Sequence, residues 1–114
     1  MRILLDECVN PRVKAAFPNH EAKTVRDMTW QGATNGELLD LAEANHFQVF
    51  VTIDQSLRYQ QQNLAARTLG FVVVKVPDNN IKFYRPLFSE LNKAAETVKA
   101  GEVIHIYSPL SRNR

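Results

Sequence analysis

The stretch Val49-Phe50-Val51-Thr52-Ile53 is followed immediately by Asp54. Its β-branched and aromatic residues favour a strand. A second apolar run, Ile3-Leu4-Leu5, lies near the start of the chain and is followed in the same way by Asp6. Short, continuous apolar runs are typical of strands that are buried on both faces, as in a parallel sheet. The two runs therefore predict two core strands, each of which ends in an aspartate.

Strands and helices alternate along the rest of the chain. Asn10-Pro11 signals the start of a helix, and Pro18-Asn19-His20 signals its end. We predict further strands over residues 21–26, 71–76 and 103–107, and further helices over residues 35–45, 55–66 and 85–100. Because parallel strands are joined by crossover connections, this alternation predicts an α/β fold with helices on both faces of a mostly parallel, five-stranded sheet. We expect residues 1–114 to form one domain.

Composition excludes several classes of protein. The 114 residues are 45% hydrophobic and 23% charged, which is usual for a globular domain. No apolar run approaches the ~20 residues that span a bilayer, so we expect no membrane association. Cys8 is the single cysteine, which rules out an intrachain disulfide and fits a reducing, cytoplasmic setting. The net charge of +2 does not by itself indicate a nucleic-acid binder.

Acidic residues follow the two core strands. Open parallel sheets place their sites outside the carboxyl ends of the strands, so Asp6, Glu7 and Asp54 are predicted to share one edge of the sheet. Crowded carboxylates repel one another, and a hard divalent cation is the common compensation. Mg²⁺ prefers oxygen ligands and binds through a few carboxylates, waters and substrate phosphates. The sequence therefore predicts a metal site at this edge.

Each of these acids also has a simpler explanation. Asp54 precedes a predicted helix and can act as its N-cap. Asp6 can be a hydrogen-bonded structural residue, and Glu7 can be a ligand, an orienting residue or an exposed acid. Thr52 lies on the same side of its strand as Asp54, where its hydroxyl can orient a carboxylate or a metal-bound water, or simply fill the sheet.

The predicted helix over residues 35–45 starts with the pattern Thr34-Asn35-Gly36-Glu37. This is the spacing of a capping box, in which Thr34 caps the helix and Glu37 reaches back. A capping role and a place at the acidic edge are both open for Glu37. Asp40, one helical turn later, is interpreted as a solvated surface residue.

Three stretches resemble the short PIN-like domains. They are Met1-Arg-Ile-Leu-Leu-Asp-Glu-Cys-Val-Asn-Pro-Arg12, Asn35-Gly-Glu-Leu-Leu-Asp-Leu-Ala42, and Phe50-Val-Thr-Ile-Asp-Gln-Ser-Leu57 with Tyr59-Gln-Gln-Gln-Asn63 after it. Many PIN-like domains are Mg²⁺- or Mn²⁺-dependent ribonucleases, and many small ones resemble VapC-type toxins that a partner antitoxin restrains. The resemblance implies a three-layer α/β/α PIN-like fold.

The resemblance also implies roles for individual residues. Asp6, Glu37 and Asp54 would be the catalytic, metal-binding acids. From their positions in the sequence, we expect Glu7 to assist in holding the metal and Thr52 and Asn35 to support the site. Asn35 stands where several relatives carry an aspartate, and residues 55–63 contain no carboxylate. The implied function is a metal-dependent endoribonuclease, the toxin of a toxin–antitoxin pair.

Three further residues are candidates for contact with RNA, namely Arg58, Tyr59 and Arg67. Tyr59 would offer a surface on which a base can stack, although Arg58 and Tyr59 also fit an ordinary surface and core. The implied partners are an RNA substrate and a small antitoxin, with a homodimer as a further option. The alternative function is a PIN-like binding module that acts through a protein partner without turnover. A receiver-like signalling domain, suggested by Lys75-Val76-Pro77, gives the Asn35–Glu37 motif no role.

Overall fold

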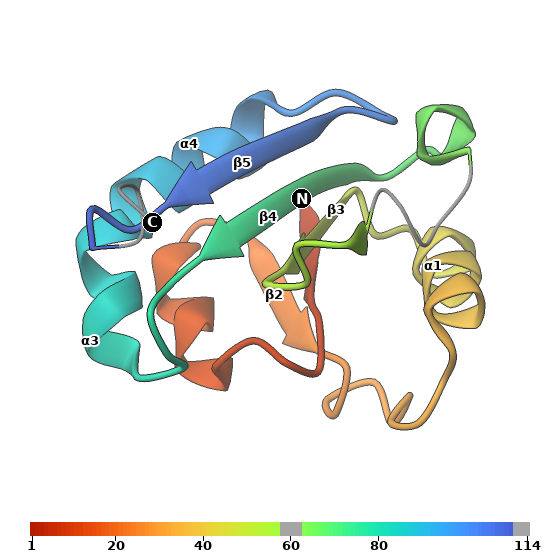
Figure 1. Ribbon diagram of the computed structural model, residues 1–114. Helices are drawn as coiled ribbons and strands as arrows, with labels where there is room; N and C mark the ends of the chain where they lie inside the picture. The colour runs from red at the N-terminus through yellow and green to blue at the C-terminus, as the bar shows by residue number, and fades with distance from the viewer. Residues whose placement is uncertain (58–62, 111–114) are drawn as a thin grey trace.

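The computed structural model describes residues 1–57 and 63–110. Five strands form one sheet in the order β2-β1-β3-β4-β5, and all four ladders are parallel (Figure 1). The strands are β1 (Arg2–Leu5), β2 (Glu21–Thr24), β3 (Val49–Thr52), β4 (Gly70–Lys75) and β5 (Val103–Tyr107). The predicted α/β class and five-stranded sheet are confirmed, and the sheet is entirely parallel.

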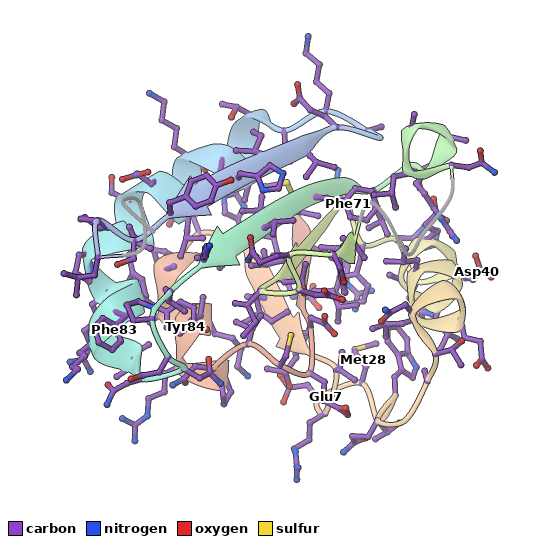
Figure 2. The ribbon with its side chains drawn as sticks, in the orientation of Figure 1. Glu7, Met28, Asp40, Phe71, Phe83 and Tyr84 are labelled. Carbon is purple, nitrogen blue, oxygen red and sulfur yellow. The ribbon has the colours of Figure 1, made fainter. Side chains whose placement is uncertain are left out.

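Two apolar clusters lie on opposite faces of the sheet and make the three layers. The first packs one face against the 3₁₀ helix η1 (Pro11–Ala16), α3 (Ile81–Tyr84), η3 (Arg85–Leu87) and α4 (Phe88–Thr97). The second packs the other face against α1 (Asn35–Ala44). Tyr84 belongs to the first cluster and Phe71 to the second, and both side chains are fully buried (Figure 2).

Helix starts agree with the sequence better than helix lengths do. The Asn10 side chain accepts a hydrogen bond from the Arg12 backbone N–H, so the predicted cap is confirmed, but the segment that follows is a 3₁₀ helix of six residues. The predicted capping box is also present, because the Thr34 side chain accepts from the Glu37 N–H and the Glu37 side chain accepts from the Thr34 N–H.

Two predicted helices need correction. The helix expected over residues 85–100 starts earlier, at Ile81, where the Asn80 side chain caps it, and it is interrupted before α4 because Pro86 supplies no N–H. The helix expected over residues 55–66 does not run unbroken to its end. Asn63 has a φ of 63° in the left-handed region, and only the short 3₁₀ helix η2 (Leu64–Ala66) follows it. The central residues of that prediction, 58–62, lie outside the described residues.

Within the described ranges, no helix combines the length and the apolar character that crossing a bilayer requires.

The turn after β2 is fixed by Asp27, whose Oδ2 accepts hydrogen bonds from Lys14 Nζ at 2.7 Å and from the Thr24 backbone N–H at 2.9 Å. The hydrogen bond from Lys14, with the one from Thr24, lowers the pKa of the Asp27 carboxyl from 3.8 to about 2. Asp27 follows Arg26 directly, so this turn sets where Arg26 leaves the sheet.

A lowered pKa makes stability depend on acid pH in a defined direction. The Asp27 carboxylate contributes its full stabilisation above its ordinary pKa of 3.8 and loses it as the pH falls toward about 2. We expect an NMR titration of the Asp27 side chain to give a midpoint near 2, and Lys14→Met to move that midpoint up toward 3.8. A midpoint that Lys14→Met leaves unchanged would show that the ion pair does not set the pKa.

Candidate functional site

The end of β1 places Asp6 against the end of β3. The Asp6 backbone N–H donates to the Val51 carbonyl at 2.9 Å, which continues the β1–β3 ladder by one residue. Asp6 Oδ2 accepts a hydrogen bond from the Thr52 hydroxyl at 2.7 Å, and Asp6 Oδ1 accepts from the Glu7 backbone N–H at 2.8 Å. The Asp6 carboxylate is therefore fixed in orientation at the carboxyl edge of the sheet.

Thr52 connects the two aspartates. Its side chain is completely buried, and its hydroxyl accepts a hydrogen bond from the Asp54 backbone N–H at 3.0 Å while donating to Asp6. One buried hydroxyl thus contacts the side chain of Asp6 and the backbone of Asp54. Of the roles open to Thr52 from the sequence, the structure shows it orienting a carboxylate.

Asp54 lies where the chain turns out of β3. Its Oδ1 accepts hydrogen bonds from the Ser56 backbone N–H at 2.9 Å and from the Ser56 hydroxyl at 2.6 Å. This is how an N-cap behaves, so one carboxylate oxygen serves the turn. The other oxygen, Oδ2, has no hydrogen-bond partner among the residues that the structure describes. Asp54 therefore combines a capping contact through Oδ1 with a place on the cavity described next.

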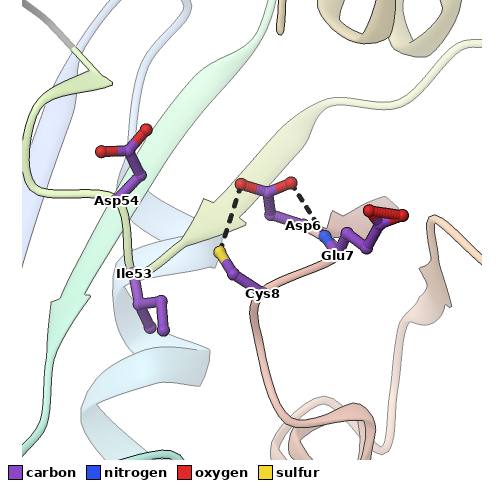
Figure 3. A pocket seen from close by; sticks show the side chains of 5 residues that line it. All are labelled: Asp6, Glu7, Cys8, Ile53 and Asp54. Atoms are coloured by element: carbon purple, nitrogen blue, oxygen red, sulfur yellow. Dashed lines mark hydrogen bonds between the residues drawn. The ribbon is translucent and has the colours of Figure 1, made fainter. Parts of the chain in front are cut away.

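Asp6, Glu7 and Asp54 line one open cavity of about 450 Å³, together with Cys8 and Ile53. Figure 3 shows Asp6 between Asp54 and Glu7 in that view, with Ile53 and Asp54 on opposite sides of the chain. Residues that lie 48 positions apart in the sequence, Asp6 and Asp54, are brought to one cavity, as the strand-end argument predicts. Glu7 is exposed at its rim.

The Cys8 thiol is part of this cavity. The residue is exposed, but its sulfur lies 3.4 Å from Asp6 Oδ2 and 3.7 Å from the Thr52 hydroxyl. Burial of the sulfur raises the pKa of the Cys8 thiol, and the negative charge of Asp6 raises it further. Cys8 is therefore a neutral thiol at neutral pH, which makes it a poor nucleophile.

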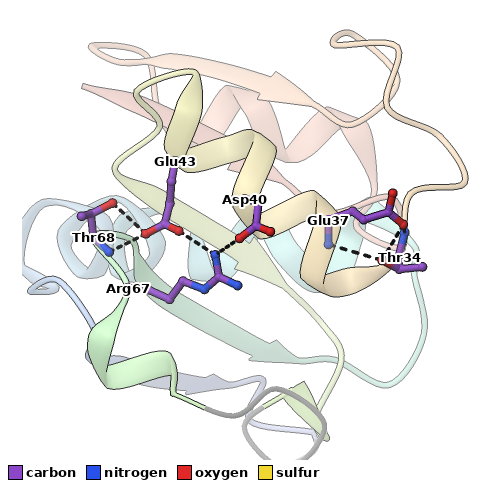
Figure 4. A network of polar contacts seen from close by, with 6 residues as sticks. All are labelled: Thr34, Glu37, Asp40, Glu43, Arg67 and Thr68. Atoms are coloured by element: carbon purple, nitrogen blue, oxygen red, sulfur yellow. Dashed lines mark hydrogen bonds and ion pairs between the residues drawn. The ribbon is translucent and has the colours of Figure 1, made fainter.

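The structure does not bring Glu37 to this cavity. The Glu37 carboxylate accepts from the Thr34 hydroxyl at 2.7 Å and from the Thr34 N–H at 3.3 Å, at the exposed start of α1 (Figure 4). The Thr34 hydrogen bonds lower the pKa of the Glu37 carboxyl. Asn35, which we expected to support the site, is the first residue of α1. Neither Glu37 nor Asn35 lines the cavity. Among the described residues there is no group of three or more His, Cys, Asp or Glu side chains placed to hold a metal ion.

Arg67 binds acidic side chains of α1. Its Nη1 lies 2.5 Å from Asp40 Oδ1 and 2.6 Å from Glu43 Oε1, and Glu43 Oε2 accepts from the Thr68 N–H and hydroxyl (Figure 4). The guanidinium of Arg67 thus anchors the segment before β4 to α1, and Asp40 is an ion-pair partner rather than only a solvated residue. The other candidates for RNA contact, Arg58 and Tyr59, lie outside the described residues.

A second cavity of about 260 Å³ adjoins the first and shares Asp6 and Glu7 with it. Arg26 and Gln31 also line it, and both are exposed. Arg26 is a cation that lines the second cavity, and the sequence argument did not select it. The strand-end rule that selected Asp6 and Asp54 applies equally to the residues that follow β2, and that signal would have found Arg26.

A comparison with protein-family models identifies a PIN-like domain over residues 1–77. The matched segment contains β1 to β4, both cavities and all three acids named by the resemblance. No curated protein and no solved structure matches the chain. The family match covers more than half of the 114 residues, and the parallel sheet with helices on both faces agrees with it. The chain belongs to the PIN-like domain family.

Proposed function

We propose that this protein is a divalent-metal-dependent endoribonuclease. The observation that carries the proposal is the placement of Asp6 and Asp54 on one open cavity, with the Thr52 hydroxyl joining them. PIN-like domains form a nuclease-type superfamily whose members generally depend on divalent metal ions. The reaction and the RNA substrate are our inference from these two supports.

The residues present suit a hard cation with few protein ligands. Asp6 and Asp54 supply carboxylate oxygens, and among the described residues no group of three or more His, Cys, Asp or Glu side chains is placed to form a closed cage. Mg²⁺ and Mn²⁺ are oxygen-preferring ions, and Mg²⁺ in particular usually keeps several waters and binds through one or two carboxylates plus substrate phosphates. An open, two-carboxylate site therefore fits an ion that an RNA phosphate helps to hold.

Each residue of the site has a distinct task in this proposal. Asp6 and Asp54 would hold the ion, and Thr52 keeps the Asp6 carboxylate aimed at the cavity. When bound, such an ion supplies an ionised water and stabilises charge on the phosphate oxygens. Glu7 lies at the rim, where its carboxylate can accept a proton from the attacking water. Arg26 lies in the adjoining cavity, where its guanidinium can bind an RNA phosphate.

The direct test is cleavage of single-stranded RNA with and without metal. We expect purified protein to cut RNA in Mg²⁺ or Mn²⁺, to lose cleavage in EDTA, and to recover it when the metal is restored. Because the site has few protein ligands, we expect half-maximal activity only at millimolar Mg²⁺. Cleavage that persists in EDTA would contradict the proposal, since the proposed reaction needs the metal ion.

A binding module without turnover is the second candidate. It is favoured by the absence of a three-residue metal group among the described residues and by the engagement of Glu37 in its capping box. The two candidates differ in one observation. Tight binding to a protein partner, with no cleavage of RNA in either metal, would favour the module.

We further propose that the ribonuclease is the toxin of a toxin–antitoxin pair. Support comes from the membership of the chain in the PIN-like family, many of whose small members resemble VapC-type toxins. In this proposal a small antitoxin covers the acidic cavity and blocks RNA, and a homodimer of the toxin is a further expectation. The cleavage assay is repeated with the product of the neighbouring gene added. We expect that product to bind the protein and to suppress RNA cleavage.

A further inference from the structure

Side chains at the carboxyl ends of β3, β4 and β5 form rows across one face of the sheet. The register pairs Thr52 with Val73 and Val73 with His105, and the next row pairs Lys75 with Tyr107. Partners in adjacent parallel strands point to the same face. His105 and Tyr107 therefore lie on the face that carries Thr52, at the same carboxyl edge as the acidic cavity.

His105 and Tyr107 are not explained by packing of the core. The residues that alternate with them, Ile104 and Ile106, belong to the apolar cluster under α4, on the opposite face. His105 and Tyr107 belong to neither apolar cluster, and Tyr107 is 38% exposed. Their rings are stacked, with centroids 6.0 Å apart and an interplanar angle of 10°. The edge strand thus presents the exposed Tyr107 ring to the solvent, with the partly buried His105 ring stacked beside it.

Lys75 lies between these rings and the acids. It is the last residue of β4, it is partly exposed, and within the described ranges its ammonium group contacts no carboxylate. Neighbouring strands are ~4.8 Å apart, so the Tyr107 row is about 10 Å from the end of β3. A few nucleotides span that distance, because stacked nucleotides rise ~3.4 Å each along a strand.

We propose that Lys75, His105 and Tyr107 form a subsite for single-stranded RNA, next to the scissile phosphate. This inference rests on the proposed ribonuclease function and deepens it. A base would stack on the Tyr107 ring, which the His105 ring backs, and the Lys75 ammonium would bind a backbone phosphate. Stacking on an aromatic ring tolerates any base, so this subsite holds and orients the strand without reading its sequence.

The test measures binding without cleavage. A short oligoribonucleotide carrying one 2-aminopurine is titrated with protein in EDTA, and both the quenching of its fluorescence and its affinity are recorded. We expect Tyr107→Phe to retain both signals, and Tyr107→Ser to abolish the quenching and weaken binding roughly 10-fold. Lys75→Gln should weaken binding and reduce the slope of log affinity against log salt by about 0.7.

The control uses a lysine and an aromatic ring on α3, where Lys82 Nζ lies 5.1 Å from the centroid of the partly exposed Phe83 ring. Phe83→Ser should bind RNA as the unmodified protein does. Circular dichroism of each variant checks that the variant is folded. Tyr107→Phe keeps the aromatic ring, so it separates loss of the ring from loss of the hydroxyl. Unchanged quenching and affinity in a folded Tyr107→Ser variant would overturn the subsite. Failure of the proposed function is a separate result, in which RNA binds but is not cut in Mg²⁺ or Mn²⁺.

Discussion

Asp6→Asn and Asp54→Asn are each expected to lower metal-dependent RNA cleavage by about 100-fold or more. Each change keeps the size of the side chain and removes one of the two carboxylate charges that would hold the proposed cation at the open cavity. With few protein ligands to share the ion, the loss of one cannot be made up by its neighbours. The measurement is the initial rate of cleavage across a Mg²⁺ titration, which separates weaker metal binding from slower chemistry.

The matched control for these variants is Glu21→Gln. Glu21 is an exposed carboxylate at the start of β2, at the opposite edge of the sheet, where it pairs with Arg2 at 3.5 Å. The Glu21→Gln variant loses one negative charge, as the aspartate variants do, but the change lies outside the cavity. We therefore expect its rate of RNA cleavage to be unchanged. If Asp6→Asn and Asp54→Asn cleave as fast as Glu21→Gln, the cavity is not the catalytic site.

Glu37→Gln separates the two roles that the sequence left open for that residue. Because Glu37 lines neither cavity and is bound to Thr34, we expect the variant to retain most of its cleavage activity and to change mainly the stability of α1. A loss as large as that of Asp54→Asn would instead assign Glu37 to the metal site in the RNA-bound protein.

Gly101→Ala is expected to destabilise the protein by roughly 3 kcal/mol. Gly101 has a φ of +79°, in the left-handed region, where a side chain costs roughly 1–2 kcal/mol. A Cβ at this position would also meet the backbone of Ala65, whose carbonyl oxygen would be 2.5 Å away. Backbone cannot rotate aside as a side chain does, so η2 or the turn before β5 must move, at a further cost of about 1–3 kcal/mol.

Gly32→Ala isolates the backbone part of this effect. Gly32 has a similar φ of +83°, but a Cβ there would have no atom within 4 Å. Urea unfolding of the two variants should therefore show a loss of about 1 kcal/mol for Gly32→Ala and a clearly larger loss for Gly101→Ala. Equal losses would show that Ala65 yields without cost and that the close approach is not a constraint.

The sheet and the two aspartates could be predicted because their signals are local. Ile3-Leu4-Leu5 and the stretch from Val49 to Ile53 are short apolar runs that end in an acid, and the geometry of parallel strands places those ends together. The capping pattern at Thr34 is equally local. These local signals cannot decide whether Glu37 caps α1 or binds the metal, because that depends on where α1 packs against the sheet.

Other features depended on contacts that no short pattern contains. The sequence makes Arg67 a candidate for contact with RNA, and in the structure its guanidinium binds Asp40 and Glu43, which lie more than 20 positions earlier in the chain. The left-handed backbone at Asn63 ends a helical pattern that otherwise continued to Ala66. The stacked rings of β5 could not be predicted from the sequence. Alternation of side chains along a strand shows which face of the sheet a residue lies on, but it does not show what covers that face.

The all-parallel sheet also sets the order of events while the chain is being made. Each ladder joins strands with an intervening crossover, so contacts between distant segments dominate, and such folds form slowly. Asp6 leaves the ribosome 48 residues before Asp54, which at ~5–20 residues per second is a delay of several seconds. Until β3 docks beside β1, Thr52 cannot reach Asp6, and no nascent fragment holds a complete acidic cavity. For the proposed ribonuclease, this order would keep the nascent chain inert toward the messenger RNA that encodes it until β3 has docked beside β1.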